Sequence, residues 1–241
     1  MVLWLVPLLP LLGAILPPLL IRSGRNVCAN ATGLVSLAAL ALLLSRAETV
    51  FSGGVERVSL TWIAQIGLNF SFRLDGLSLF FAAMILIIGL LVIVYARFYL
   101  DRDDPVGRFY AYLLLFQGAM LGVVLSDNLI LLLIFWELTS LTSFLLIGYW
   151  RHRQDAREGA RMALIVTGGG GLALIAGLML LGHIAGTYEI SELLTRGDII
   201  KASPLYLPAL LLILLGAFTK SAQFPFHFWL PHAMAAPTPV S

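Results

Sequence analysis

Long apolar runs separated by short polar segments organise this chain of 241 residues. A transmembrane helix needs about 17–25 mainly apolar residues. Seven runs meet this requirement, at residues 2–21, 27–45, 76–98, 109–125, 128–150, 161–185 and 205–224. An eighth would begin near Pro237, close to the last residue. The pattern predicts an all-α integral membrane protein with about seven transmembrane helices and the start of an eighth.

The first apolar run contains several prolines. Four prolines lie in residues 2–21, and we expect them to kink that helix, which membrane helices tolerate. No basic residue precedes the run, so we expect a retained helix rather than a cleaved signal peptide.

Residues 47–75 form the only long polar segment and alternate in places between apolar and polar positions. A short hairpin at the membrane surface and an irregular surface loop both fit this segment.

The composition supports a membrane location and excludes several site types. Apolar residues make up 60% of the chain and charged residues 12%, against about 45–50% and about 25% in soluble domains. The net charge of +2 gives no reason to expect a nucleic-acid partner. The single cysteine, Cys28, rules out an internal disulfide and a thiolate metal cluster.

Basic residues in alternate loops predict the orientation, because cytoplasmic loops carry an excess of lysine and arginine. One side carries nine such residues and the other side five. The nine are Arg22, Arg25, Arg97, Arg102, Arg108, Arg151, Arg153, Arg157 and Arg161, and the five are Arg46, Arg57, Arg73, Arg196 and Lys201. The first side is therefore expected to be cytoplasmic, with the N-terminus outside.

Two charged residues, Glu137 and Lys220, lie well inside the fifth and seventh apolar runs. A central charge costs about 2.5–3.5 kcal/mol on membrane-insertion scales, so such residues face the bundle and are usually paired. We expect Glu137 to pair with Lys220, directly or through water. The pair is either a structural ion pair or a proton-transfer site. In the second case, moving the carboxylate would let a desolvated lysine release its proton.

The surroundings of both residues contain further polar groups. Ser140 lies near Glu137 on the same helix face, while Thr139, Thr142 and Ser143 spread over the other side. We expect some of these hydroxyls to bond back to their own helix or to a neighbouring helix. Pro225 should break the seventh helix just after Lys220.

His227, beyond this break, is a second candidate for proton transfer. It lies seven residues after Lys220, on the same face if the helix resumes its phase. Near neutral pH an imidazole can pass protons, although an interfacial, hydrogen-bonded histidine is the alternative. A metal site from His227 and His232 is not expected, because their spacing is unsuitable and proline intervenes.

Three segments resemble one family of membrane subunits. FWELTSLTSFLLIGYW, TKSAQFPFHFWLPHAMAAPTPVS and FRLDGLSLFFA are similar to antiporter-like subunits shared by Mrp-type cation/proton antiporters, respiratory complex I and membrane-bound hydrogenases. The resemblance covers nearly the whole chain. GARMALIVTGGGGLALIAGLMLL, with its run Gly168–Gly171, and His227 favour the A subunit of Mrp antiporters. Within an apolar span, we expect the glycines to let helices approach closely.

The resemblance implies a function and a role for each candidate residue. It implies a subunit of a sodium/proton antiporter, a secondary transporter and not an enzyme, with no cofactor. Its partners would be other membrane subunits, sodium ions and protons in a prokaryotic plasma membrane. Glu137, Lys220 and His227 would transfer protons, with Gln223, Pro225 and Asp75 in supporting positions. A redox-driven proton pump and an assembly scaffold with inert charges are the alternatives.

The resemblance also implies a domain organisation. Residues 1–241 would form a single membrane domain, with three helices and the 47–75 loop in residues 1–108. Residues 109–241 would hold most of the first five-helix repeat, and we expect the chain to be an N-terminal portion of a longer or split subunit. The sodium site is left open among Asp75, Asp101, Asp103, Asp104 and Asp127, which solvation or helix capping also explains.

Overall fold

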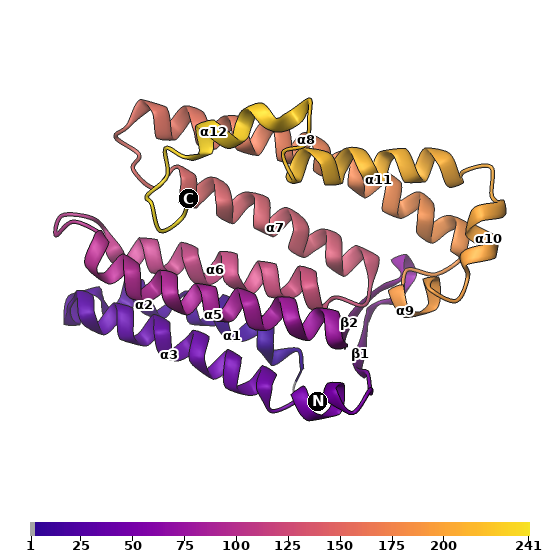
Figure 1. Ribbon diagram of the computed structural model, residues 1–241, viewed down its shortest axis with the longest axis horizontal. Helices are drawn as coiled ribbons and strands as arrows, with labels where there is room; N and C mark the ends of the chain where they lie inside the picture. The colour runs from indigo at the N-terminus through magenta and orange to yellow at the C-terminus, as the bar shows by residue number, and fades with distance from the viewer. Residues whose placement is uncertain (1–2) are drawn as a thin grey trace. The chain divides into compact units, whose positions relative to one another are not determined.

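The computed structural model describes residues 3–241, and most of this part of the chain is helical (Figure 1). Six helical segments are long and apolar enough to cross a membrane: Leu5–Ser23, Arg25–Phe51, Gly76–Tyr99, Val106–Leu125, Leu129–Ile147 and Gln154–Ala185. A further apolar helix, Tyr206–Lys220, is shorter. The predicted all-α membrane fold is confirmed, while the count of seven spans stays a prediction.

The first span is divided into three short pieces. Helix α1 (Leu5–Gly13) is followed by α2 (Leu16–Leu20) and the 3-10 helix η1 (Ile21–Ser23). Pro17 and Pro18 lie in the first turn of α2, where a missing amide hydrogen costs little because those amides have no partner within the helix. The interruption expected from the prolines is therefore present between Gly13 and Leu16.

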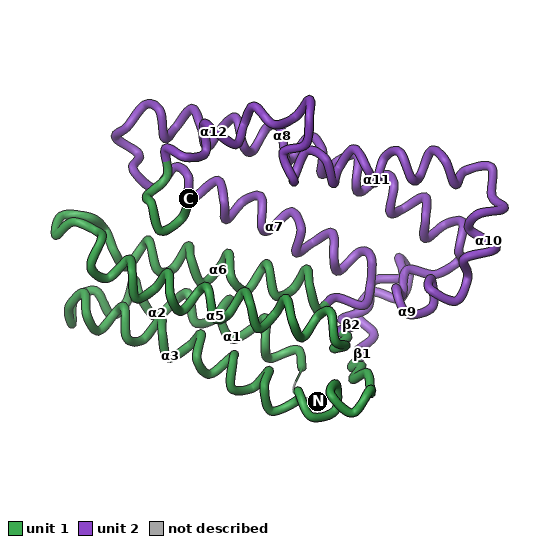
Figure 2. Tube along the Cα trace, viewed as in Figure 1, with its two compact units in different colours: residues 1–58, 73–125, 236–241 green, residues 59–72, 126–235 purple. Residues whose placement is uncertain are grey.

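The chain divides into two compact units, and the first comprises residues 1–58, 73–125 and 236–241 (Figure 2). Its helices are α1, α2, α3 (Arg25–Leu44), α4 (Ala47–Phe51), α5 (Gly76–Tyr99) and α6 (Val106–Leu125). Helix α3 packs on α1 and α5, and α6 packs on the same two helices. Buried Ser36 donates a 2.7 Å hydrogen bond to the Gln117 side chain, which joins α3 to α6 inside this unit.

Residues 47–75 contain a hairpin, as the first of the two alternatives predicted, while its place at the membrane surface stays a prediction. Strand β1 (Glu56–Ile63) pairs with β2 (Leu68–Leu74) in a two-stranded sheet. The turn holds the 3-10 helix η2 (Ala64–Ile66) and Gly67, whose φ of 69° suits a residue without a Cβ. Most of β1 is exposed, while β2 has several buried side chains.

The second unit comprises residues 59–72 and 126–235 (Figure 2). Its helical elements are α7 (Leu129–Ile147), α8 (Gln154–Ala185), α9 (Ile190–Leu193), α10 (Gly197–Ala202), α11 (Tyr206–Lys220), η3 (Phe226–Phe228) and α12 (Trp229–Ala233). Helix α8 packs against α7, α11 and α12 (Figure 1). The long helix α8 therefore contacts all three of these helices.

Asp75 caps the N-terminus of α5. Its carboxylate accepts a hydrogen bond from the Ser78 amide at 2.9 Å, and Ser78 Oγ accepts one from the Asp75 amide at 2.8 Å. Arg73 forms a 3.0 Å ion pair with the same carboxylate. Desolvation raises the pKa of Asp75, but the Ser78 hydrogen bonds and the Arg73 charge outweigh it, so the pKa lies below its usual value.

We expect Asp75→Ala to lower the free energy of unfolding by about 1 kcal/mol at pH 7, because it removes a helix cap. A depressed carboxyl pKa stabilises the fold above the unfolded pKa of about 3.9, and this stabilisation is lost as pH falls through the folded pKa. Thermal unfolding of wild type and variant at pH 7 and at pH 2, below the folded pKa window, measures both effects. Asp103→Ala, at an exposed loop position, is the control, and an equal loss there would contradict the capping role.

Candidate functional site

Glu137 lies in the middle of α7 and is half-buried. Its Oε1 atom is fully buried and has no hydrogen-bond partner within residues 3–241. A buried carboxylate oxygen without a partner is costly, and protonation or a new partner removes that cost. Glu137 therefore has a buried polar atom that the described residues leave unsatisfied.

Lys220 is the last residue of α11, and its side chain reaches α7. Its Nζ donates a 2.7 Å hydrogen bond to Ser140 Oγ and lies 5.4 Å from the ring centroid of Trp136. No direct ion pair joins Lys220 to Glu137 in the described chain, although the two charges interact electrostatically. Because Ser140 is one helical turn from Glu137, the lysine is held beside the carboxylate by the serine.

Two glycines of α8 let this site form. A Cβ at Gly171 would lie 2.0 Å from Glu137 Oε1, and a Cβ at Gly170 would lie 1.7 Å from Thr219 Oγ1. Gly170 thus faces Thr219 of α11, the residue before Lys220, and Gly171 faces Glu137 of α7. A Cβ at Gly168 or Gly169 would meet no atom within 4 Å. The predicted close helix approach is confirmed for the second half of the glycine run only.

The other hydroxyls of α7 bond back to their own helix, as expected. Thr139 Oγ1 donates to the Trp136 carbonyl at 2.6 Å, Thr142 Oγ1 to the Leu138 carbonyl at 2.8 Å, and Ser143 Oγ to the Ser140 carbonyl at 3.0 Å. Among the four hydroxyls that follow Glu137, only Ser140 contacts Lys220. It is the residue that connects the two charged side chains.

Helix α11 ends immediately after Lys220, five residues before Pro225. The Gln223 amide donates to the Phe218 carbonyl at 2.9 Å and the Ala222 amide to the Thr219 carbonyl at 3.3 Å. This pair of bonds is the Schellman motif, which places its penultimate residue in the left-handed region and strongly favours glycine there. Ala222 occupies that position with a φ of 52°. The helix end beside Lys220 is therefore conformationally strained.

A second interaction closes the same helix end. Trp229 Nε1, at the start of α12, donates a 2.9 Å hydrogen bond to the Thr219 carbonyl. Helix α12 is in turn held against α8, where a Cβ at Gly159 would lie 2.3 Å from the His232 carbonyl oxygen. The carbonyl freed by the helix break is thus taken by protein groups.

We expect Ala222→Gly to raise the free energy of unfolding by about 0.5–1 kcal/mol. The change relieves a left-handed Cβ, and the flexibility that glycine adds to the unfolded chain offsets part of that gain. Ala217→Gly, in the interior of α11, should instead lower stability by about 1 kcal/mol. Melting temperatures of the two variants provide the comparison, and a loss of stability in both would argue against strain at Ala222.

The side chain of His227 lies apart from the contacts of Lys220 and Glu137. His227 is exposed in η3 and stacks on Phe224, with ring centroids 5.7 Å apart. Gln223 and Pro225 are also exposed. No hydrogen bond or ion pair connects His227 with Lys220 in the described residues, because the chain does not resume the phase of α11. The roles assigned to His227, Gln223 and Pro225 stay predictions.

The acidic candidates for a sodium site have structural partners or lie in an exposed loop. Asp75 is the cap of α5. Asp127 accepts hydrogen bonds from the backbone amide and hydroxyl of Ser191, at 3.1 Å and 2.6 Å. Asp101 and Asp103 are exposed, and Asp104 accepts a 3.0 Å hydrogen bond from the Asp101 amide. Their assignment to sodium stays open.

Sequence reasoning did not identify Ser140 as the partner of Lys220, nor Trp136, Trp229 or Ala222 as parts of the site. The position of Ser140 three residues after Glu137 was a usable signal, because such residues share a helix face. The contacts of Trp136 and Trp229 depend on how separate helices rotate toward one another. A glycine at position 222 would have predicted the left-handed turn, but the residue there is Ala222.

Two family profiles match the chain. Residues 126–241 match the family described as NADH:quinone oxidoreductase/Mrp antiporter, and residues 61–110 match the N-terminal part of chain 5 of NADH-ubiquinone oxidoreductase (complex I). The first match contains Glu137, Ser140 and Lys220. The second contains the end of β1, all of β2 and α5, and the start of α6.

Curated relatives align with nearly the whole chain. The A/B subunit of a probable K⁺/H⁺ antiporter of Rhizobium meliloti is 53% identical over 97% of this chain and 23% of its own length. The A subunit of a Na⁺/H⁺ antiporter of Alkalihalophilus pseudofirmus is 49% identical over 96% of this chain and 29% of its own length. The chain thus spans about a quarter of the length of these relatives.

Solved structures agree with the sequence comparisons. A chain of the Mrp complex from Dietzia sp. DQ12-45-1b matches all of this chain and 26% of its own length, with a TM-score of 0.87 and 34% identity. An archaeal membrane-bound sulfane sulfur reductase shares the fold at a TM-score of 0.85, with 23% identity and coverage of 99% and 49%. Together with the apolar helices, the bacterial relatives identify a multi-pass plasma membrane protein. The chain belongs to the NADH:quinone oxidoreductase/Mrp antiporter family.

Proposed function

We propose that this chain forms the N-terminal part of the A subunit of a cation/proton antiporter. The relatives that align with nearly all of it are named as such subunits. Because the chain spans about a quarter of their length, the transport activity would require the remainder of that polypeptide together with its partner proteins. The likeness to the archaeal respiratory complex supports the shared fold alone, so we place the redox-driven pump second.

A proton would pass through Glu137, Ser140 and Lys220. The observation that carries this proposal is the buried, unpartnered Oε1 of Glu137 one turn from the serine that holds Lys220. A charged Glu137 stabilises the protonated lysine, whereas a neutral or displaced Glu137 favours proton release. Reprotonation from the opposite side would complete one step, and His227 beyond the helix break is the proposed next group.

The transported cation is sodium in our first proposal and potassium in the second. Of the two curated relatives described above, one is named for potassium and the other for sodium, so both ions need testing. Inverted vesicles containing the complete complex would be given a proton gradient and then sodium, potassium or choline chloride. Collapse of the gradient by sodium alone supports the first proposal, and collapse by potassium alone supports the second. No response to either ion would favour the redox-driven pump.

The N-terminus would lie outside the cell, as the arginine distribution indicates. A cysteine at Ser52 should then react with a membrane-impermeant maleimide added to intact cells. A cysteine at Asp103 should react only after the membrane is opened. Both positions are exposed, and Cys28 is buried, which lowers background labelling. The reverse labelling pattern would contradict this orientation.

A further inference from the structure

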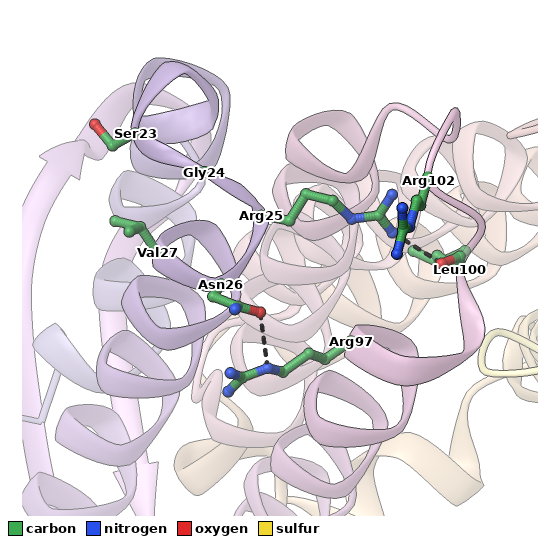
Figure 3. A pocket seen from close by; sticks show the side chains of 8 residues that line it. All are labelled: Ser23, Gly24, Arg25, Asn26, Val27, Arg97, Leu100 and Arg102. Carbon is green, nitrogen blue, oxygen red and sulfur yellow. Dashed lines mark hydrogen bonds between the residues drawn. The ribbon is translucent and has the colours of Figure 1, made fainter.

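A hollow lined by three arginines lies between the start of α3 and the end of α5, within the first unit. Its volume is about 550 Å³, and its lining includes Arg25, Arg97 and Arg102 (Figure 3). Arg25 extends from α3 to the Leu100 carbonyl, and Arg97 extends from α5 to the Asn26 side chain (Figure 3). The two long side chains therefore cross the space between these helices in opposite directions.

The three guanidinium groups of this hollow form no ion pair within the described part of the chain. Arg25 donates to the backbone carbonyls of Asp101 and Leu100. Arg97 donates to the amide oxygens of Asn26 and Asn30, at 3.1 Å and 3.2 Å. All these acceptors are uncharged, and none of the ion pairs among residues 3–241 includes Arg25, Arg97 or Arg102. The three guanidinium groups are therefore available to an anion that enters the hollow.

The start of α3 adds to the same field. Gly24 precedes the helix and provides no side-chain cap, and Ser23, Gly24 and Arg25 all line the hollow. Free amides at a helix N-terminus favour a phosphate or carboxylate. This contribution is secondary to the three guanidinium groups, which bind phosphate oxygens with two parallel hydrogen bonds.

An apolar groove of about 420 Å³ continues from the hollow between the same helices, and Arg97 lines both. Its walls include Gly33, Leu34 and Leu37 of α3 and Leu90, Ile93 and Val94 of α5, with Asn30 near the Arg97 end. From Arg25 to Leu37 the groove follows α3 for about 18 Å at 1.5 Å per residue. One leaflet of a bilayer has an apolar thickness of about 15 Å. The groove therefore matches one acyl chain in length and polarity.

We propose that this hollow and groove bind one anionic phospholipid, with its phosphate among the three arginines and one acyl chain along the groove. Basic pockets between transmembrane helices on the cytoplasmic side bind such head groups, and these arginines lie on the side predicted to be cytoplasmic. A free anion would use the hollow alone. The apolar groove that begins at Arg97 selects a lipid.

The test uses the complete antiporter complex in detergent with trace phosphatidylglycerol that carries a photoactivatable diazirine on one acyl chain. Matched phosphatidylcholine is the zwitterionic control, and cross-links are mapped by mass spectrometry of peptides. We expect phosphatidylglycerol to label α3 and α5 preferentially. Excess inorganic phosphate should compete weakly, because it lacks the acyl chain.

Three variants separate the head-group site from the groove. Arg25→Gln with Arg97→Gln should reduce phosphatidylglycerol labelling about fivefold per arginine, while Arg25→Lys with Arg97→Lys should retain most of the preference. Gly33→Leu should fill the groove, and its Cβ would start in open space, with no atom within 4 Å. The controls are Arg57→Gln on exposed β1 and Gly169→Leu, a second open helical glycine.

Four outcomes would overturn the proposal. These are equal labelling by the two lipids, labelling unchanged in the glutamine double variant, complete displacement by inorganic phosphate, and no labelling of α3 or α5. The last result would mean that another polypeptide covers the groove in the complex. The proposal is supported if labelling is lost only in the groove variant and the head-group variant.

Discussion

Lys220→Ala is expected to reduce cation-dependent proton movement by roughly 100-fold, the contribution typical of a positioned proton-transfer group. The variant removes the amine that donates to Ser140 and leaves Glu137 without its nearby positive charge. Glu137→Gln should have a comparable effect, because an amide neither carries charge nor releases a proton at pH 7. Gradient collapse in inverted vesicles measures both variants at equal membrane abundance.

Matched substitutions separate charge from proton release. Lys201→Ala removes the only other lysine of the chain, at an exposed position in α10, and should leave transport unchanged. Lys220→Arg retains the positive charge but does not release a proton in proteins, so it should be as inactive as Lys220→Ala. If Lys220→Arg transports at the wild-type rate, Lys220 is a structural cation and proton transfer through it is disproved.

Ser140→Ala examines the contact that holds the lysine. A hydrogen bond to a charged group contributes about 1.5–3 kcal/mol, so its loss should lower transport without removing either ionisable group. The expected activity lies between wild type and Lys220→Ala. A combined Ser140→Ala and Lys220→Ala variant should be no worse than Lys220→Ala alone, because both changes act on one interaction.

The second large effect is expected from the glycines of α8, which differ in the space around them. Gly171→Ala would place a methyl group on the Glu137 carboxylate, and this flexible side chain can move aside. We therefore expect transport to fall strongly while folding is retained. Gly170→Ala would press on the branched Thr219 side chain and separate α8 from α11, at a cost of about 1–3 kcal/mol.

Neighbouring glycines provide the control for this prediction. Gly168→Ala and Gly169→Ala add a methyl group in open space and should stabilise α8 by up to about 1 kcal/mol through helix propensity. Thermal unfolding and transport rates of the four variants give the comparison. Equal behaviour of all four would contradict the contacts described here, since only two of them touch the candidate site.

The apolar runs predicted the membrane helices well because a bilayer demands long uncharged segments with internal backbone hydrogen bonds. The apolar runs predicted the helix ends less well near Lys220. The run there continues to residue 224, whereas α11 ends at Lys220, before Pro225. Proline favours a break nearby, but the Schellman bonds to Phe218 and Thr219 select the residue.

The candidate site was predicted in its charged residues but not in its contacts. Glu137 and Lys220 stand out in the sequence because isolated charges in apolar helices are expensive. Which group accepts the lysine hydrogen bond depends on the rotation of α7 and α11 around α8, which hydropathy does not encode. Ser140 therefore appeared as the acceptor only in the folded chain.

The sequence by itself determined the all-α membrane fold and the two intramembrane charges, because each follows from local composition and the cost of burying polar groups. The tertiary structure alone decided which two of four adjacent glycines contact Glu137 and Thr219, where the strained turn at Ala222 lies, and that three arginines gather beside an apolar groove. These features arise from packing between segments distant in sequence, where a few degrees of helix rotation change every contact.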